Sequence, residues 1–398
     1  MVRTLQSTSA AGRPISAIGA AVTGCAALAV AQGVGRFAFT PILPMMQADA
    51  GVSVVTGGWL AAANYLGYLV GALAAARVHM RAAAAVRAAL ALVVLATLAM
   101  GVVDGLASWL ALRFAAGVAS AWIMVFGCAW ALQQLAKAGA PLLGGVVFAG
   151  VGAGITAVGV GVAALHASAS SGETWLAIGA ASLAASAAIW MPLSAGRAAP
   201  APSRARTAAA KTGRHGLILA YGLAGFGYIV PATFLPTMAR QAIADASLFV
   251  WSWPVFGAAA MISTLLAAAL TRALGTRRVW ALAQAAMGVG VALPLILHGT
   301  AGVMLSAAMV GGTFMVTTMA GIQVARETGG DEATQLIAAM TAAFALGQLA
   351  GPVVVSSVAA VAEPFPVAIP LASALLFLGA VLVNASPAPQ TASQGAHS

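Results

Sequence analysis

The stretch GVGRFAFTPILPMM (Gly33 to Met46) places an arginine inside a long apolar run. The whole chain has 398 residues, of which 62% are hydrophobic and 7% are charged, whereas a soluble domain carries about 25% charged residues. Apolar runs of about 20 residues, long enough to cross a bilayer, recur along the chain. The chain is therefore expected to be solvated by lipid, and the arginine needs a specific role there.

The apolar runs predict an all-α membrane protein with twelve transmembrane helices. In a hydrocarbon core without water, each run must satisfy its backbone hydrogen bonds internally, as a helix does. The expected spans are residues 15–46, 56–76, 88–103, 106–132, 141–165, 174–194, 215–239, 248–271, 279–298, 301–324, 334–361 and 367–386. Ala29–Ala31 resembles a signal-peptidase site, but apolar sequence continues past it, which argues against cleavage.

The basic residues support this count and predict an orientation. If the N-terminus is cytoplasmic, 15 of the 18 Lys and Arg residues fall on the cytoplasmic side. The opposite loops then hold one arginine, Arg240, and the acids Asp49, Asp104, Glu173, Asp245 and Glu363. This is the positive-inside distribution. It accounts for the net charge of +10 without nucleic acid as a partner, and it places both termini in the cytoplasm.

A basic stretch divides the chain into two halves. Residues 195–214 belong to a Pro/Ala-rich segment near the middle of the chain, which is typical of a flexible connector. We therefore expect six-helix halves over residues 1–194 and 215–386. Residues 387–398 are expected to form a disordered tail.

The opening stretch recurs in the second half as GFGYIVPATFLPTM (Gly225 to Met238), and both copies match G-x-G-x7-L-P-x-M. The same offset carries Trp59 onto Trp251, and it makes Tyr228 the equivalent of Arg36. The first and seventh helices therefore correspond to each other. Two parallel halves related by a pseudo-two-fold axis along the membrane normal are expected.

Six plus six helices with a basic central loop resemble the major facilitator superfamily of transporters over nearly the whole chain. Arg113–Gly117 is similar to that superfamily's fourth-helix motif. More narrowly, Gly33–Met46, Gly57–Leu73 and Thr341–Pro352 resemble the YbfB/YjiJ-type branch of bacterial transporters. The resemblance implies a monomer that works by alternating access. The aspartate usual after the second helix is missing from Gly71–Arg87, which puts a gating salt bridge built on it in doubt.

Arg36 and Arg113 are the ionisable side chains that lie well inside the expected hydrocarbon core. Their helical rise places them ~15 Å and ~10 Å from the outer ends of their helices. The resemblance implies that both helices line a central cavity. A guanidinium stays charged and forms a bidentate fork, so both arginines are candidate ligands for an anion such as a carboxylate. Alternatively, each pairs with helix carbonyls or with an acid, such as Asp49 or Asp104, and holds a gate.

Polar and aromatic side chains complete the candidate substrate site. Gln32 shares a helix face with Arg36, and Asn64 shares one with Tyr68. The full candidate set is Arg36, Gln32, Arg113, Asn64, Tyr68, Tyr221, Tyr228, Thr317 and Gln348. Hydrogen bonding between buried helices is the alternative role for the uncharged members.

Three tryptophans lie near the ends of expected spans, where aromatic rings anchor a protein at the membrane surface. These expected anchors are Trp59, Trp175 and Trp251.

The leading function is a secondary active or facilitative transporter of a small organic solute, with an anion as the main hypothesis. The middle of the expected spans lacks Asp, Glu and His, so proton coupling has no visible relay, and no Walker-type loop indicates ATP use. The alternatives are a multidrug or lipophilic efflux carrier and a membrane sensor that moves no solute. An enzyme is not expected, because clustered His, Asp or Glu residues are absent from the sequence.

The expected partners are a small-molecule solute and the lipid bilayer, and no cofactor or metal is predicted. The Ala and Gly richness with frequent Arg indicates GC-rich DNA and hence the cytoplasmic (inner) membrane of a bacterium.

Overall fold

The computed structural model describes residues 15–75, 77, 80–195, 214–243, 245–329 and 332–386. Within these ranges every regular element is helical, and twelve helical units are long and apolar enough to cross a membrane. The predicted all-α, twelve-helix membrane fold is thereby confirmed. Most of the predicted linker and all of the predicted tail lie outside the described residues, so the domain boundaries stay predictions.

The first six units cover the sequence up to the linker, and π-helical segments interrupt two of them. They are α1 (Ala17–Leu28), η1 (Ala29–Val34) and α2 (Phe39–Asp49); α3 (Val54–Ala75); α4 (Ala82–Met100); α5 (Leu106–Trp122), η2 (Ile123–Gly127) and α6 (Cys128–Lys137); η3 (Pro141–Leu143) and α7 (Gly144–Leu165); and α8 (Ser171–Trp190), followed by η4 (Pro192–Ala195).

The last six units are long and less interrupted. They are α9 (His215–Ala242); the short α10 (Ala246–Phe249) before α11 (Ser252–Leu274); α12 (Thr276–Ile296); α13 (Gly299–Gly329); α14 (Ala333–Ala359); and α15 (Phe365–Ala385).

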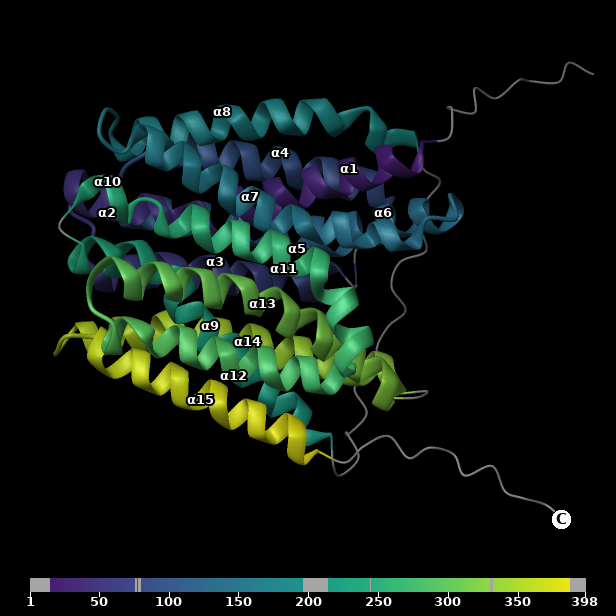
Figure 1. The fold of residues 1–398 in the computed structure, drawn as a ribbon. Coiled ribbons are helices and arrows are strands. Elements are labelled where there is room, and N and C mark those ends of the chain that lie inside the picture. The colour runs from purple at the N-terminus through teal and green to yellow at the C-terminus, as the bar shows by residue number, and fades with distance from the viewer. Residues whose placement is uncertain are drawn as a thin grey trace, which may run out of the picture.

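The helices run side by side along one common direction, with α8 at one edge of the bundle and α15 at the other (Figure 1). The elements α1 to α8 form the N-terminal half, and α9 to α15 form the C-terminal half. We call the end where α8 stops and α9 begins the linker end. The first span starts at the linker end and finishes at the opposite end.

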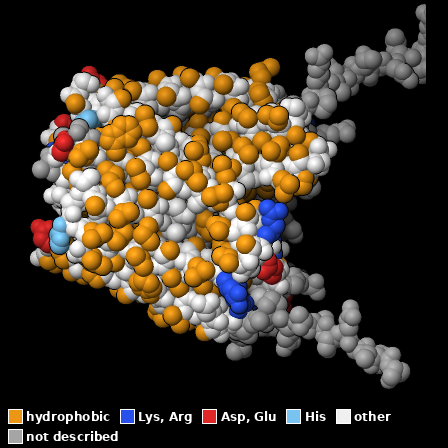
Figure 2. Space-filling view, in the orientation of Figure 1, with side chains coloured by type: hydrophobic (Ala, Val, Ile, Leu, Met, Phe, Trp, Pro, Cys, Tyr) orange, Lys and Arg blue, Asp and Glu red, His pale blue; other side chains and the backbone are white. Residues whose placement is uncertain are grey.

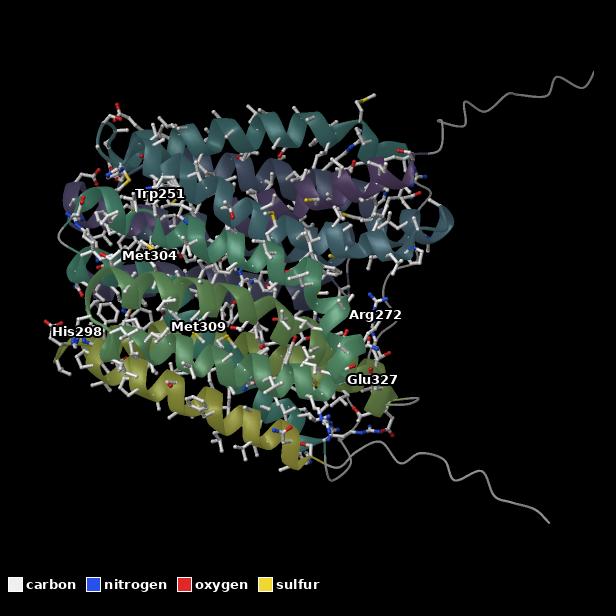
Figure 3. The ribbon with its side chains drawn as sticks, in the orientation of Figure 1. Trp251, Arg272, His298, Met304, Met309 and Glu327 are labelled. Carbon is white, nitrogen blue, oxygen red and sulfur yellow. The ribbon has the colours of Figure 1, made fainter. Side chains whose placement is uncertain are left out.

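Hydrophobic side chains cover the middle of the visible surface, and charged side chains gather toward its two ends (Figure 2). Figure 3 places Arg272 and Glu327 at the linker end, and Trp251 and His298 at the opposite end. This distribution fits an apolar band in lipid between two wet surfaces.

Two of the three predicted tryptophan anchors are exposed, and the third is not. The repeat-equivalent Trp59 and Trp251 are 46% and 48% exposed, as an interfacial position requires. Trp175 is only 2% exposed. It lines a small cavity with Thr97 and Arg113, so its prediction as an anchor is wrong. The sequence shows only that Trp175 lies near a helix end. It does not show that α8 packs on α4, which buries the ring of Trp175.

The two halves are joined by hydrogen bonds toward the end opposite the linker. Thr40 Oγ1 donates to the carbonyl of Ala232 at 2.8 Å. Further bonds join Tyr65 to Thr233, Arg240 to the Pro44 carbonyl, and Ser356 to the Val55 carbonyl. Thr40 and Ala232 are equivalent positions of the sequence repeat, so their contact lies beside the pseudo-two-fold axis.

A proline explains why the Ala232 carbonyl accepts a bond from the other half. In a regular helix this carbonyl would accept from the N–H four residues later, but that residue is Pro236, which has no N–H. The fully buried carbonyl of α9 therefore depends on the hydroxyl of Thr40.

Replacing Thr40 with valine is expected to weaken the closure of this end. The change keeps the side-chain shape but leaves a buried carbonyl without a donor, which costs about 1–3 kcal/mol, or a roughly 5- to 150-fold shift of a two-state equilibrium. The measurement is the rate at which a maleimide labels Thr237→Cys, a buried α9 position five residues after Ala232, in protein without Cys25 and Cys128. Thr264→Val is the control, because Thr264 bonds only within its own helix. Equal labelling rates in the two variants would contradict this role.

Candidate functional site

The first span is broken at the position of Arg36. The sequence predicts one helix over residues 15–46, but α1 stops at Leu28, a π-helical turn follows, and residues 35–38 form turns before α2. The Thr40 N–H bonds to the Phe37 carbonyl at 3.2 Å and not to the Arg36 carbonyl that a regular helix would offer. The break therefore leaves main-chain carbonyls without helical donors in the middle of the bundle.

Arg113 and Asn64 bind the carbonyls that the break exposes. Arg113 Nη2 donates to the Arg36 carbonyl at 3.0 Å. Asn64 Nδ2 donates to the Gly35 carbonyl at 3.0 Å and to the Arg113 carbonyl at 2.8 Å. These bonds tie α3 and α5 to the broken span. Helix carbonyls are the alternative partners that the sequence analysis left open, whereas contact of either residue with substrate stays a prediction.

Arg113 also packs against an aromatic ring of α2 and against a small cavity within the N-terminal half. Its guanidinium carbon lies 4.8 Å from the ring centre of Phe39. Arg113 also lines a cavity of about 10 Å³ whose other walls come from the first span, α4, α5 and α8. A space of this size has room for about one water and not for a solute.

Replacing Asn64 with leucine is expected to destabilise the protein. Two buried carbonyls would lose their donor, at about 1–3 kcal/mol each, so the thermal midpoint should fall by several degrees. The measurement is thermal unfolding of the purified protein in detergent. The control is Asn384→Leu, because Asn384 is exposed near the end of α15. An unchanged midpoint for Asn64→Leu would mean that these bonds do not support the broken span.

Arg36 is held by rings and one amide, and part of its guanidinium has no partner. The residue is 6% exposed. Its guanidinium carbon lies 4.2 Å from the ring centre of Tyr68, 5.1 Å from that of Phe37 and 5.3 Å from that of Tyr65. Nη1 donates to Gln32 Oε1 at 3.3 Å. Nε and Nη2 are buried without a hydrogen-bond partner, which is rare for buried donors.

The two unpartnered nitrogens of Arg36 lie on the same edge of its planar group. Such an edge can donate two parallel hydrogen bonds to the two oxygens of one carboxylate. The Nε2 of Gln32 beside it is also buried without a partner. The Tyr68 hydroxyl lies close to both Arg36 and Gln32, and no buried carboxylate of the described residues uses these donors.

No acidic residue of the described ranges balances this charge. All described Asp and Glu residues are exposed or half-buried. Asp49, one of the acids considered as a partner for the arginines, instead accepts from the main chain and hydroxyl of Ser171 at 2.6 and 2.8 Å. The hypothesis that Asp49 pairs with one of the arginines is therefore wrong, because its carboxylate caps the start of α8.

The C-terminal half contributes Tyr228, the repeat equivalent of Arg36. Its ring is stacked between Phe314 at 5.3 Å and Phe344 at 5.5 Å. Gln348 donates to its hydroxyl, and this hydroxyl lies within electrostatic range of Arg36 and Tyr68. The two equivalent positions thus face a common region from opposite halves.

Two further candidates lie in the C-terminal half, on α9 and α13. Tyr221 donates to the Thr318 carbonyl at 3.1 Å, and its ring is 4.9 Å from that of Phe344. Thr317 is 1% exposed, and its hydroxyl has no partner. The structure therefore brings Tyr221, Tyr228 and Gln348 together, and it places Gln32 and Tyr68 beside Arg36.

A row of aromatic rings runs from Phe37 in the N-terminal half to Phe314 in the C-terminal half. The sequence analysis did not predict most of these residues as part of the site. Adjacent ring centres are 6.1 Å apart for Phe37 and Trp253, 4.8 Å for Trp253 and Phe256, and 5.4 Å for Phe256 and Phe314. In an apolar helix such residues look like ordinary core. The one available signal was the position of Phe37 next to Arg36.

Twelve spans in two repeated halves, with a polar site between the halves, define a membrane transporter of the major facilitator type. The chain matches the family described as "Uncharacterised MFS-type transporter YbfB" over residues 28–384, and it belongs to that family. A comparison with curated proteins finds no match. The chain is similar to the crystal structure of a point mutant of the nucleoside transporter NupG, with a TM-score of 0.68, 14% identity, and coverage of 92% of this chain and 98% of that one. At this identity the likeness shows the fold alone.

Proposed function

We propose that the protein is a secondary transporter, active or facilitative, that carries a small organic anion across the membrane by alternating access. The observation that carries this proposal is the unpartnered Nε–Nη2 edge of Arg36. A buried charge without a counter-charge costs several kcal/mol, and charged residues inside a membrane protein mark substrate pathways. An anionic substrate would supply the missing partner.

The proposed roles divide the candidate residues into two groups. Arg36 binds the anion, and Gln32, Tyr68, Tyr228, Gln348, Tyr221 and Thr317 border the substrate on the two walls. Arg113 and Asn64 act as positioning residues, because their donors hold carbonyls of the broken span. This grouping narrows the initial hypothesis, in which both arginines bind substrate.

Alternating access requires that the site open to one side at a time. The hydrogen bonds between Thr40 and Ala232 and between Tyr65 and Thr233 join the halves next to Arg36. We propose that they close the site toward the end opposite the linker, and that they part when the protein opens to that end. We further propose that the linker end and both termini are cytoplasmic, in a bacterial inner membrane, and that the protein works as a monomer.

The test is thermal unfolding of the purified protein with a panel of organic anions, matched neutral amides and organic cations. A ligand that binds only the folded state raises the unfolding temperature by mass action. We expect stabilisation by anions, and uptake of the same compound by proteoliposomes. Stabilisation by amides or cations without any response to anions would overturn the proposal.

A second candidate function is efflux of uncharged lipophilic compounds. The row of rings from Phe37 to Phe344 favours it, because aromatic side chains bind apolar ligands of many shapes. Under this function a neutral lipophile would stabilise the wild type and Arg36→Ala equally. Under the anion proposal only the wild type responds.

A further inference from the structure

We propose that the substrate is a monoanion with one carboxylate and an aromatic ring, and without an ammonium group. This inference rests on the proposed function and narrows its substrate class. Three features of the site carry it: the number of unused cationic donors, the positions of the acids, and the positions of the tyrosines.

The site offers one cationic edge and not two. Arg36 and Arg113 are the buried Lys or Arg residues of the described ranges. Arg113 donates Nη2 to the Arg36 carbonyl and lies against Phe39, so although its Nε has no partner, its Nε–Nη2 edge is not free to bind a carboxylate with two parallel hydrogen bonds. Arg36 spends Nη1 on Gln32 and keeps the Nε–Nη2 edge. One bidentate edge matches one carboxylate. A dianion would bring a second carboxylate with no second free bidentate edge to bind it.

The positions of the acids argue against an ammonium group on the substrate. Recognition of a buried ammonium needs a carboxylate or a comparable set of acceptors. No Asp or Glu among the described residues is buried, and Asp49 is committed to Ser171. An amino acid would therefore lose the hydration of its ammonium group without gaining an ionic partner.

The tyrosines indicate an aromatic body. The chain has four tyrosines, and all four lie in this region. Tyr65, Tyr221 and Tyr228 are 2–3% exposed, and Tyr68 is half-buried beside Arg36. In membrane proteins tyrosines are typically enriched at the lipid–water interface, so their confinement to the interior needs another reason.

Two aromatic residues on opposite walls keep exposed surface. They are Tyr68 on α3 and Phe344 on α14, both half-buried. The rings of Tyr228 and Tyr221 pack against Phe344, with ring centres 5.5 and 4.9 Å away. Since aromatic pairs attract beyond their buried area, we expect a planar ring attached to the carboxylate to contact Tyr68 and Phe344 more favourably than an aliphatic body of the same size.

The experiment compares dissociation constants of probe ligands for the full-length protein, measured by ligand-dependent thermal unfolding. The probes are benzoate, cyclohexanecarboxylate, phthalate, phenylalanine and benzamide. They keep a similar size while changing the ring, the number of negative charges, the ammonium group or the carboxylate. We expect benzoate to bind at least about threefold tighter than cyclohexanecarboxylate and at least about tenfold tighter than the other three.

The outcomes separate this inference from the proposed function. Equal binding of benzoate and cyclohexanecarboxylate, or tighter binding of phthalate or phenylalanine, overturns the inference but leaves anion transport standing. Stabilisation by benzamide alone overturns both.

Side-chain variants test the contact of the ligand ring with Tyr68 and Phe344, and the test holds even if a variant is less stable than the wild type. Tyr68→Leu and Phe344→Leu are expected to reduce the benzoate to cyclohexanecarboxylate affinity ratio toward one, while Tyr68→Phe keeps the ratio of the wild type. A ratio between two ligands is insensitive to a uniform loss of folded protein. Wild-type ratios in both leucine variants would overturn the aromatic part of the inference.

Discussion

Proteoliposomes with Arg36→Ala are expected to take up the anionic substrate at least about thirtyfold more slowly than the wild type. Removing one partner of a buried charge pair costs about 2–5 kcal/mol. Arg36→Lys is expected to recover only part of the loss, because an ammonium is a point charge without the bidentate edge. The measurements are the initial uptake rate and the dissociation constant of the anion in detergent.

The stability of the same variant without ligand distinguishes a binding role from a structural one. The Nε–Nη2 edge of Arg36 has no protein partner, so its removal relieves an unbalanced buried charge. The thermal midpoint of ligand-free Arg36→Ala should therefore be equal to that of the wild type or higher. Arg113→Ala, which leaves the Arg36 carbonyl without its donor, should lower the midpoint. A midpoint that falls as far in Arg36→Ala as in Arg113→Ala would assign Arg36 a structural role.

Replacing Gly152 with valine is expected to stop transport by separating the two halves. A Cβ at Gly152 on α7 would lie 2.3 Å from the main-chain nitrogen of Met261 and 2.7 Å from the Gly257 carbonyl, both on α11. Main-chain atoms cannot rotate away, so α7 and α11 must move apart. Overpacking of this kind costs about 1–3 kcal/mol, which displaces a two-state equilibrium roughly 5- to 150-fold away from the conformation described here.

The control for this change lies on the same helix. Gly145 on α7 has no neighbour within 4 Å of an added Cβ, so Gly145→Val introduces the same side chain without the clash. We expect faster maleimide labelling of Thr237→Cys and much slower uptake in Gly152→Val, with Gly145→Val close to the wild type. If both variants transport alike, the α7–α11 contact does not take part in the transport cycle.

The number and type of the helices could be predicted from the sequence because lipid imposes them on long stretches of chain. Each span needs about 20 apolar residues, so an error of several residues at a helix end changes nothing essential. The repeat between Gly33–Met46 and Gly225–Met238 was also readable, and the bond between its equivalent positions Thr40 and Ala232 agrees with it. Arg36 could also be identified from the sequence, because a charged residue stands out within an apolar membrane-spanning run.

The partners of individual atoms could not be predicted in this way. Arg36 and Arg113 look alike in the sequence, yet one keeps an unused donor edge and the other binds a carbonyl. That difference depends on the break in the first span, which frees carbonyls at Gly35 and Arg36, and on α3 and α5 arriving beside it.

The sequence by itself thus determined the membrane fold, the repeat and the presence of a costly buried arginine. The physical reason is that partitioning of a helix into lipid depends on the summed hydropathy of many residues, which can be read without knowing any contact. Only the tertiary structure decided which arginine keeps a pair of unpartnered donors, that Trp175 is buried, and that four tyrosines from α3 and α9 gather in the region of Arg36. The physical reason is that a hydrogen bond or a ring contact depends on single atoms a few ångströms apart. Such atoms come from helices that are distant in the chain.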